Sequence, residues 1–393
     1  MSSLATHTPD SPIEFICLGS GTSSLVPHVD CLTAPPEATP CKTCLSTLHP
    51  EGKKNIRRNT SAALRLRDKH GEQRTIIIDV GKSFQASAIE WFPKYGLRRI
   101  DAVLITHAHA DAMNGLDDLR GWTLRSAIQS HVDLYVTMHT FQEVQRAFPY
   151  LVSKEFASGG GDVPEFKWHI IEDRVPFEIE NTGIKIAPFA VHHGRIFSTL
   201  PAREFYPTPT SLSPASTNPS TPPQQPSTPL PIEEPVELTT SIRPYLCLGF
   251  VIQDSVVYLS DVSHIPEDVW AMFGRGQAGD RSQAVPPVFV LDCLRLQPHT
   301  SHLGIAEAIT VARRMGAART YLTGFGHEVS HEEYVSVCEA VGGKAPADAQ
   351  LTPTVREALD LVPPGETLWV RPAYDGLRVF VSGEKTVRDE AYD

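Results

Sequence analysis

The stretch that decides the fold is LITHAHADAMNG, residues 104–115. Four apolar residues at 102–105 predict a buried strand, after which the chain becomes polar at His107. Because alternate residues of an extended segment point the same way, His107, His109 and Asp111 can face one cavity. Imidazole and carboxylate groups suit zinc, iron or manganese, so this loop predicts a metal site.

Strand and helix signals extend outward from this loop in both directions. Strands are predicted at 13–18, 62–67, 75–80, 102–105, 134–136, 184–191, 246–252, 256–259, 288–291 and 319–323. Helices are predicted at 83–91, 114–129 and 305–315. Strands followed by helices, twice over, favour a layered α/β protein formed by a single domain over 1–393.

Composition limits the classes of partner. The formal charge of -11 argues against a broad electrostatic grip on nucleic acid or an anionic membrane. The sequence has no apolar run long enough to span a bilayer, and its first residues lack the order of a secretory signal. We therefore expect a cytoplasmic or nuclear protein, in which the seven cysteines are thiols or metal ligands.

One segment differs from the rest in composition. Residues 201–240 are dominated by proline, serine and threonine. Such a segment cannot bury enough apolar surface to offset the entropy lost on ordering. We expect a disordered insertion between two strands, acting as a solvated spacer.

The histidine motif resembles the signature H-x-H-x-D-H of the metallo-β-lactamase superfamily. The following GLDDLR, residues 115–120, looks like the branch of phosphoribosyl cyclic phosphate phosphodiesterases, and more distantly the tRNA 3′-processing nucleases. The resemblance implies a four-layer αββα sandwich with metals at one rim.

Later motifs follow the order of that family. In IIIDVG the resemblance implies that Asp79 orients a metal-bound histidine, a role that suits a ligand whose second nitrogen must be fixed. FAVHHG supplies the third histidine, for which His193 fits better than His192 because it directly precedes the glycine. YLSDVS supplies Asp261, which bridges two metals in the family. The implied ligands of the catalytic metal are His107, His109, His193, Asp111 and Asp261.

The sequence departs from the family at the second metal. The D-H pair has become Asp111-Ala112, and glycine stands at 324 where the late L-T-H motif has its histidine. We therefore expect one catalytic ion, zinc or manganese, and leave a second open. Three histidines could compensate: His264, His299 and His302. Of these, His302 best matches a histidine that assists catalysis in the phosphodiesterase branch.

A second site is predicted in the loop at 26–54. Three cysteines, Cys31, Cys41 and Cys44, stand where few core residues are available, and tetrahedral zinc sites use three or four such ligands. The resemblance implies that His327 closes a structural zinc site, with His331 as the substitute. The remaining cysteines are predicted to be packing residues: Cys17, Cys247, Cys293 and Cys338.

These residues favour a metal-dependent hydrolase, a phosphodiesterase that uses metal-activated hydroxide on a small cyclic phosphate ester. Asp111 and Asp261 would orient the hydroxide, and His302 would protonate the leaving alkoxide. Arg120 and Arg125 could neutralise the charge that develops in the reaction, although a position on the surface of a helix explains both residues better.

Two alternatives stay open. The same fold supports thioester or lactone hydrolysis, and fold alone does not separate these chemistries. The missing second-site ligands also suit a scaffold that kept one metal and lost turnover. In the preferred reading the partner is a small-molecule phosphate ester, with neither a membrane nor extended nucleic acid bound.

Overall fold

The computed structural model describes residues 12–158, 162–198, 241–276 and 285–392. The predicted insertion at 201–240 lies outside the described residues. The chain forms two compact units, one comprising 1–194 and 246–393, the other 195–245. Of the second unit, the described part consists of the ends of two strands. None of the helices in the described ranges is both long and apolar enough to cross a membrane.

The first sheet has eight strands in the described residues. In spatial order they are β15 (Val387–Asp389), β14 (Arg378–Val381), β1 (Ile13–Gly19), β2 (Ser61–Arg67), β3 (Gln73–Ile78), β4 (Ala102–Leu104), β5 (Val132–Val136) and β6 (Phe166–Ile170). Neighbours are antiparallel from β15 to β3 and parallel from β3 to β6.

The second sheet has seven strands within the same ranges. Their order is β13 (Val370–Pro372), β12 (Arg319–Thr323), β11 (Val288–Asp292), β10 (Val256–Leu259), β9 (Ser241–Ile252), β8 (Lys185–Ser198) and β7 (Phe177–Glu178). Strands β10 to β13 are parallel, and β9 runs antiparallel to β10. Both sheets therefore contain a parallel block, and the site lies where those blocks end.

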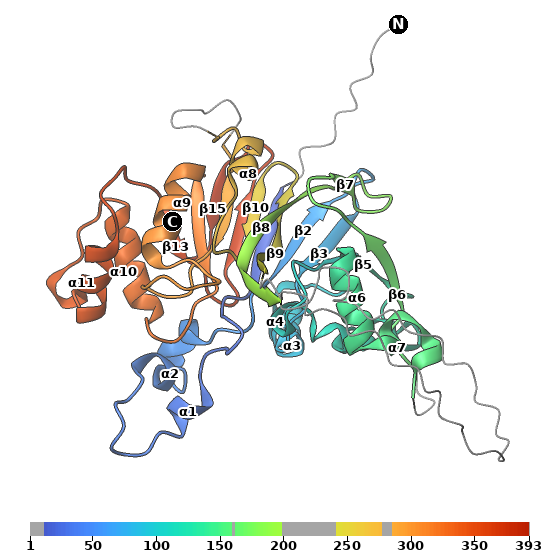
Figure 1. The fold of residues 1–393 in the computed structure, drawn as a ribbon, viewed down its shortest axis with the longest axis horizontal. Coiled ribbons are helices and arrows are strands. Elements are labelled where there is room, and N and C mark those ends of the chain that lie inside the picture. The colour runs from blue at the N-terminus through green and yellow to red at the C-terminus, as the bar shows by residue number, and fades with distance from the viewer. Residues whose placement is uncertain (1–11, 159–161, 199–240, 277–284, 393) are drawn as a thin grey trace, which may run out of the picture. The chain divides into compact units, whose positions relative to one another are not determined.

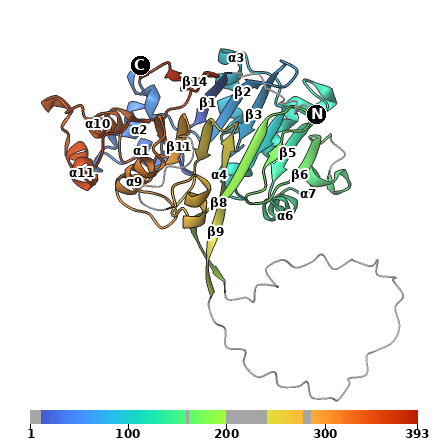
Figure 2. The same ribbon diagram turned by 90° about the horizontal axis from the view of Figure 1, so that it is seen from above.

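Helices cover the outer face of each sheet (Figures 1 and 2). Against the first sheet lie α3 (Phe84–Tyr95), α6 (Met138–Ala147) and α7 (Pro149–Val152). Against the second lie α8 (Glu267–Met272), α9 (Ile305–Met315), α10 (His331–Val341) and α11 (Pro353–Leu361). Shorter helical turns are α1 (Val29–Leu32), α2 (Lys42–Ser46), η1 (Pro50–Asn55), α4 (Ala110–Met113), η2 (Leu116–Leu119), α5 (Arg120–Thr123), η3 (Leu124–Ser126), η4 (Lys154–Phe156) and η5 (Asp348–Gln350).

Strand alternation explains the layers. In β1 the side chains of Phe15 and Cys17 join the apolar cluster between the two sheets. Their neighbours Ile16 and Leu18 join the cluster between the first sheet and its helices. Since a strand presents successive side chains to opposite faces, a sheet with two apolar faces must be covered on both. The predicted four-layer αββα architecture is confirmed.

The predicted helix at 114–129 is wrong as a continuous element. The segment consists of short turns that end at Ser126, because Arg125 and Ser126 adopt left-handed backbone angles, with φ of 52° and 54°. Such angles cannot continue a right-handed helix. By contrast, the helix at 305–315 and the strand at 319–323 have the predicted bounds.

Candidate metal centre

The candidate site lies at one rim of the two sheets, where parallel strands end. Strand β4 leads to His107, β10 leads to Asp261, and β11 ends on Asp292. Carboxyl ends of parallel strands gather at one edge, which is where open α/β sheets place their sites. Residues far apart in the chain are thus brought together by topology.

Three histidines converge at this rim. Ligand nitrogens of His107, His109 and His193 all lie within 4.8 Å of one another. The ring centroids are 4.5 Å apart for His107 and His109, 5.0 Å for His107 and His193, and 5.1 Å for His109 and His193. Loss of hydration, and then the neighbouring imidazoles, lowers the pKa of His107 to about 3 and that of His109 to about 4. Both rings are therefore neutral at physiological pH, as metal ligands must be.

Close backbone packing fixes the histidine loop against the end of β3. A Cβ atom at Gly81 would lie 1.8 Å from the carbonyl oxygen of Asp111, and one at Gly115 would lie 2.3 Å from that of Gly81. Only glycine allows these approaches. The backbone N–H of Val80 donates to Ala112 across the same contact. The sequences IIIDVG and HAHADAMNG therefore dock as a pair.

Hydrogen bonds orient two of the rings. Asp79 accepts the hydroxyl of Thr106 at 2.8 Å, and that hydroxyl lies 2.8 Å from Nδ1 of His107. Since the Thr106 hydroxyl donates to Asp79, Nδ1 of His107 donates to that hydroxyl, and Nε2 of His107 is left for a metal. The carbonyl oxygen of Ser301 accepts from Nδ1 of His193 at 2.8 Å, with the same result.

Two carboxylates accompany the histidines. Burial raises the pKa of Asp261, but His107 and His193 outweigh it and hold the pKa below its ordinary value. The pKa of Asp111 is raised, first by burial and then by Asp261. Asp261 is thus the permanent negative charge of the site. It lies within 4.8 Å of His193 and His302 by their ligand atoms.

His302 is anchored by Asp292. Its Nδ1 lies 3.1 and 3.2 Å from the two carboxylate oxygens, and Asp292 is fully buried. A Cβ atom at position 324 would lie 2.6 Å from Oδ1 of Asp292, and Gly324 has a φ of +81°. Because position 324 is glycine and not the histidine of the family pattern, the carboxylate of Asp292 has room to lie beside it.

A cavity of about 520 Å³ opens in front of these groups. Its lining includes His109, Asp111, His193 and His302, together with Thr22, His28, His327 and Glu328. His299 also lines it. The remaining predicted residues lie elsewhere: the rings of His192 and His264 contact each other, Arg120 pairs with Asp117, and Arg125 pairs with Asp162.

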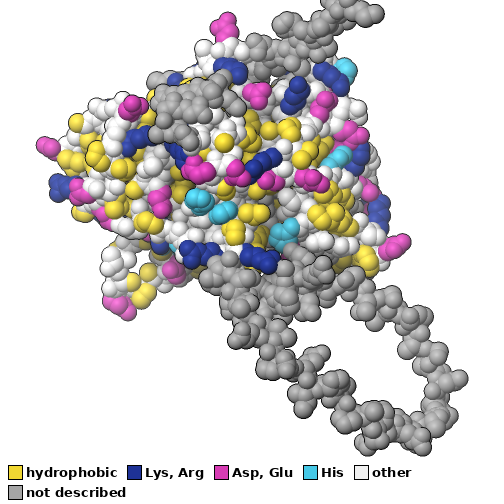
Figure 3. Space-filling view, turned by 45° about the horizontal axis from the view of Figure 1, so that its top comes forward, with side chains coloured by type: hydrophobic (Ala, Val, Ile, Leu, Met, Phe, Trp, Pro, Cys, Tyr) yellow, Lys and Arg dark blue, Asp and Glu magenta, His cyan; other side chains and the backbone are white. Residues whose placement is uncertain are grey.

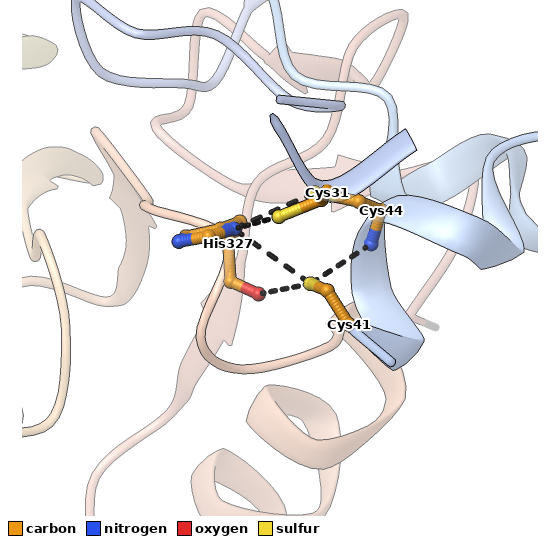
Figure 4. Close-up of side chains that lie close together, drawn as sticks. All are labelled: Cys31, Cys41, Cys44 and His327. Carbon is orange, nitrogen blue, oxygen red and sulfur yellow. Dashed lines mark hydrogen bonds between the residues drawn. The ribbon is translucent and has the colours of Figure 1, made fainter. Parts of the chain in front are cut away.

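The three cysteines meet His327 in a separate cluster (Figure 4). Nδ1 of His327 lies 3.3 Å from the sulfur of Cys31, 3.7 Å from that of Cys41 and 3.5 Å from that of Cys44. Tetrahedral zinc with typical bond lengths separates sulfur and nitrogen ligands by about 3.6 Å, so the donor set fits such an ion. His331 lies away from the cluster, with its Nε2 3.1 Å from the hydroxyl of Tyr392.

A buried arginine holds the loop that carries His327. Arg57 is 1% exposed and donates to the carbonyl oxygens of Gly326 and Val329, the latter at 2.9 Å. Its guanidinium lies 5.2 Å from the ring centroid of Phe325. These contacts flank His327 on both sides in the chain.

The sequence pattern of the beta-lactamase superfamily domain matches residues 74–213, which contain His107, His109, Asp111 and His193. The protein carries a metallo-β-lactamase superfamily domain. Metallo-β-lactamase folds are metallo-hydrolase folds whose members bind metal ions, and the His-rich site and the Cys₃His cluster both offer donor sets that could hold a metal ion.

Two solved structures and one curated relative resemble this chain. A diphosphatase of the PhnP family is 21% identical, with a TM-score of 0.58 over 94% of this chain and 97% of its own. Zinc-bound PqqB from Methylobacterium extorquens is 17% identical, with a TM-score of 0.54 over 93% and 99%. These likenesses show the fold alone. An octanoyltransferase of Porphyromonas gingivalis is 29% identical over 183 residues, 46% of this chain; the match spans 31% of that relative's length.

The structure adds residues that sequence reasoning did not assign to this candidate site. Thr106, Ser301 and Asp292 hold the rings in place. The sulfur of Cys247, predicted as a packing residue, lies 3.8 Å from Nδ1 of His107. Thr106 and Asp292 each stand next to a strand end, which is the signal that could have identified them.

Proposed function

We propose that the protein is a metal-dependent phosphodiesterase that hydrolyses a small cyclic phosphate ester. The observation that supports this most is the presence of a three-histidine cluster and an anchored fourth histidine in one cavity. The cluster has the donor atoms to hold a metal ion, and His302 can protonate the leaving group. Hydrolysis of a phosphodiester needs both, because charge develops on the attacking and the leaving oxygen.

The chain's own residues have distinct roles in this proposal. An ion held by His107, His109 and His193 would lower the pKa of a water molecule toward neutrality and polarise a phosphoryl oxygen. Asp111 and Asp261 orient the attacking water from the side of the cluster. His302, held by Asp292, donates its Nε2 proton to the leaving alkoxide.

We propose one catalytic ion, zinc or manganese, and one structural zinc in the Cys₃His cluster. The second catalytic position lacks two histidines of the family pattern, at Ala112 and Gly324. Asp261 and His302 still converge there with His193. Metal analysis of the purified protein should therefore give two ions per chain, and a third only if His302 acts as a ligand.

The face shown in Figure 3 and the size of the cavity favour a small substrate over extended nucleic acid. On the face shown in Figure 3, lysine and arginine side chains stand among acidic ones. A long polyanion binds to a continuous basic stripe. The cavity volume of about 520 Å³ suits a ligand of nucleotide size.

A catalytically weakened scaffold is the second candidate, because two second-site ligands are absent. Acyl-ester chemistry is a third, and the partial match to an octanoyltransferase is compatible with it. The buried Asp292–His302 pair favours turnover, since a scaffold has no need of a buried proton donor.

The test offers bis-p-nitrophenyl phosphate and a 2′,3′-cyclic nucleotide to the wild type and to His109→Ala. We expect the wild type to hydrolyse the cyclic nucleotide and His109→Ala to lose at least a hundredfold in kcat/KM. His264→Ala is the matched control, because His264 contacts His192 outside the cluster. Equal rates for the wild type and His109→Ala would contradict the proposal.

A further inference from the structure

His327 belongs to two places at once. Figure 4 shows one ring nitrogen among the three sulfurs and the other pointing away from them. The nitrogen near the sulfurs is Nδ1, at 3.3 to 3.7 Å. The same residue lines the cavity that also contains His109, His193 and His302. His327 is therefore both a member of the cysteine cluster and part of the lining of the proposed catalytic cavity.

A histidine bound through Nδ1 is fixed as a donor at Nε2. The N–H at the second nitrogen of a metal ligand needs an acceptor, usually a carboxylate, a carbonyl or water. The side chain of His327 is only partly buried, so this N–H can meet an acceptor in the cavity. A bound cation also makes it a stronger donor by withdrawing electron density from the ring.

His28 fixes the plane of that ring. The two imidazoles stack with centroids 3.8 Å apart and an interplanar angle of 21°. The backbone N–H of His28 donates to the sulfur of Cys44 at 3.3 Å. Both the ring and the backbone of His28 are thus tied to the cluster. A donor with a fixed plane discriminates between ligands better than a mobile one.

We propose that His327 is a specificity-determining residue, whose Nε2–H contacts the non-reacting part of the substrate while Nδ1 serves the zinc. This inference rests on the proposed phosphodiesterase function. It names the substrate class more closely: a cyclic phosphodiester whose sugar or base carries a hydrogen-bond acceptor, held in the cavity that His327 lines together with His109 and His193.

The test uses His327→Cys, which supplies a fourth sulfur so that the zinc can stay, but removes the imidazole donor. The substrates are adenosine 2′,3′-cyclic phosphate and ethylene phosphate, the same five-membered ring without sugar or base. We expect the variant to keep its structural zinc. The ratio of kcat/KM for the nucleotide to that for ethylene phosphate should fall about tenfold, through KM.

The control is His264→Cys, which makes the same exchange outside the cavity and should leave the ratio unaltered. If His327→Cys loses zinc, His28→Ala serves instead, because His28 fixes the ring from a position outside the cluster. A zinc-loaded His327→Cys or a His28→Ala variant with an unaltered ratio would overturn the inference.

A wild type inactive on both substrates would reject the phosphodiesterase proposal itself. Equilibrium binding of adenosine 2′-monophosphate to the metal-loaded wild type and His327→Cys then decides the inference separately. Weaker binding by the variant supports it, and equal or undetectable binding by both proteins contradicts it.

Discussion

The Asp292→Asn exchange removes the charge that keeps His302 protonated while it preserves the shape of the buried side chain. In the metal-free protein, burial alone would lower the pKa of His302, but Asp292, assisted by Asp261 and Asp111, outweighs burial and raises the pKa to about 9. The side chain of His302 is 13% exposed and that of Asp292 is fully buried, so solvent screens this pair little.

The magnitude follows from the two pKa values. A rise from 6.5 to about 9 corresponds to about 3 kcal/mol of preference for the imidazolium. Because the folded pKa lies above the unfolded one, this stability is fully present below about pH 6.5 and is lost as the pH rises through about 9. In Asp292→Asn we expect the pKa of His302 to fall, since burial is then opposed only by the more distant charges of Asp261 and Asp111.

The assay is a pH titration of ¹³Cε1-labelled histidine in the metal-free protein, with the His302 signal assigned by a His302→Gln variant. Urea unfolding at about pH 6 and about pH 9.5 gives the linked stability, which should drop by about 3 kcal/mol in the wild type and by less in Asp292→Asn. A wild-type His302 that titrates near 6.5, or an equal pH dependence of stability in both proteins, would refute the reasoning.

Three further predictions concern the metal centres. Thr106→Val removes the hydroxyl that links Asp79 to His107 and should weaken catalytic metal binding about 10- to 100-fold in a chelator competition. The control is Thr320→Val. Thr320 is buried and its hydroxyl has no hydrogen-bond partner among the described residues, so this exchange should not change the affinity. Gly324→His should not add a metal ion, because Oδ1 of Asp292 lies 2.6 Å from the new Cβ; an extra ion in metal analysis of this single variant would disprove the steric argument. Cys44→Ser should release the structural zinc and destabilise the loop at 26–54, and zinc content unchanged from the wild type would rule out that site.

Periodic signals predicted the layers well. The helix at 305–315 was predictable because its apolar residues recur at helical spacing and Gly316, with a φ of +69°, ends it. The segment at 114–129 has helical composition, but the left-handed angles of Arg125 and Ser126 depend on how the chain packs beyond it. Strand β6 was missed because FKWHI lies at a sheet edge and none of its residues is fully buried.

The site was predictable only in part. The histidine loop can be recognised from its own spacing, whereas the choice of His193 depended on the order of family motifs. The Asp292–His302 pair could not be derived, because it requires knowing that β10, β11 and β12 lie side by side and parallel. Gly324 reads in the sequence as a lost ligand. In the structure, the missing side chain at position 324 leaves room for the carboxylate of Asp292.

The buried guanidinium of Arg57 has a consequence for the order of assembly. It grips the main chain before and after His327 with bonds that involve no sulfur, so that histidine is in place before any ion arrives. Removal of the metal with a chelator should therefore release only the cysteine loop at 26–54. This loop would become sensitive to protease, while amides around residue 327 stay protected from hydrogen exchange. Folding therefore precedes metal loading, and the cysteine loop at 26–54 closes last, onto a His327 that is already in position.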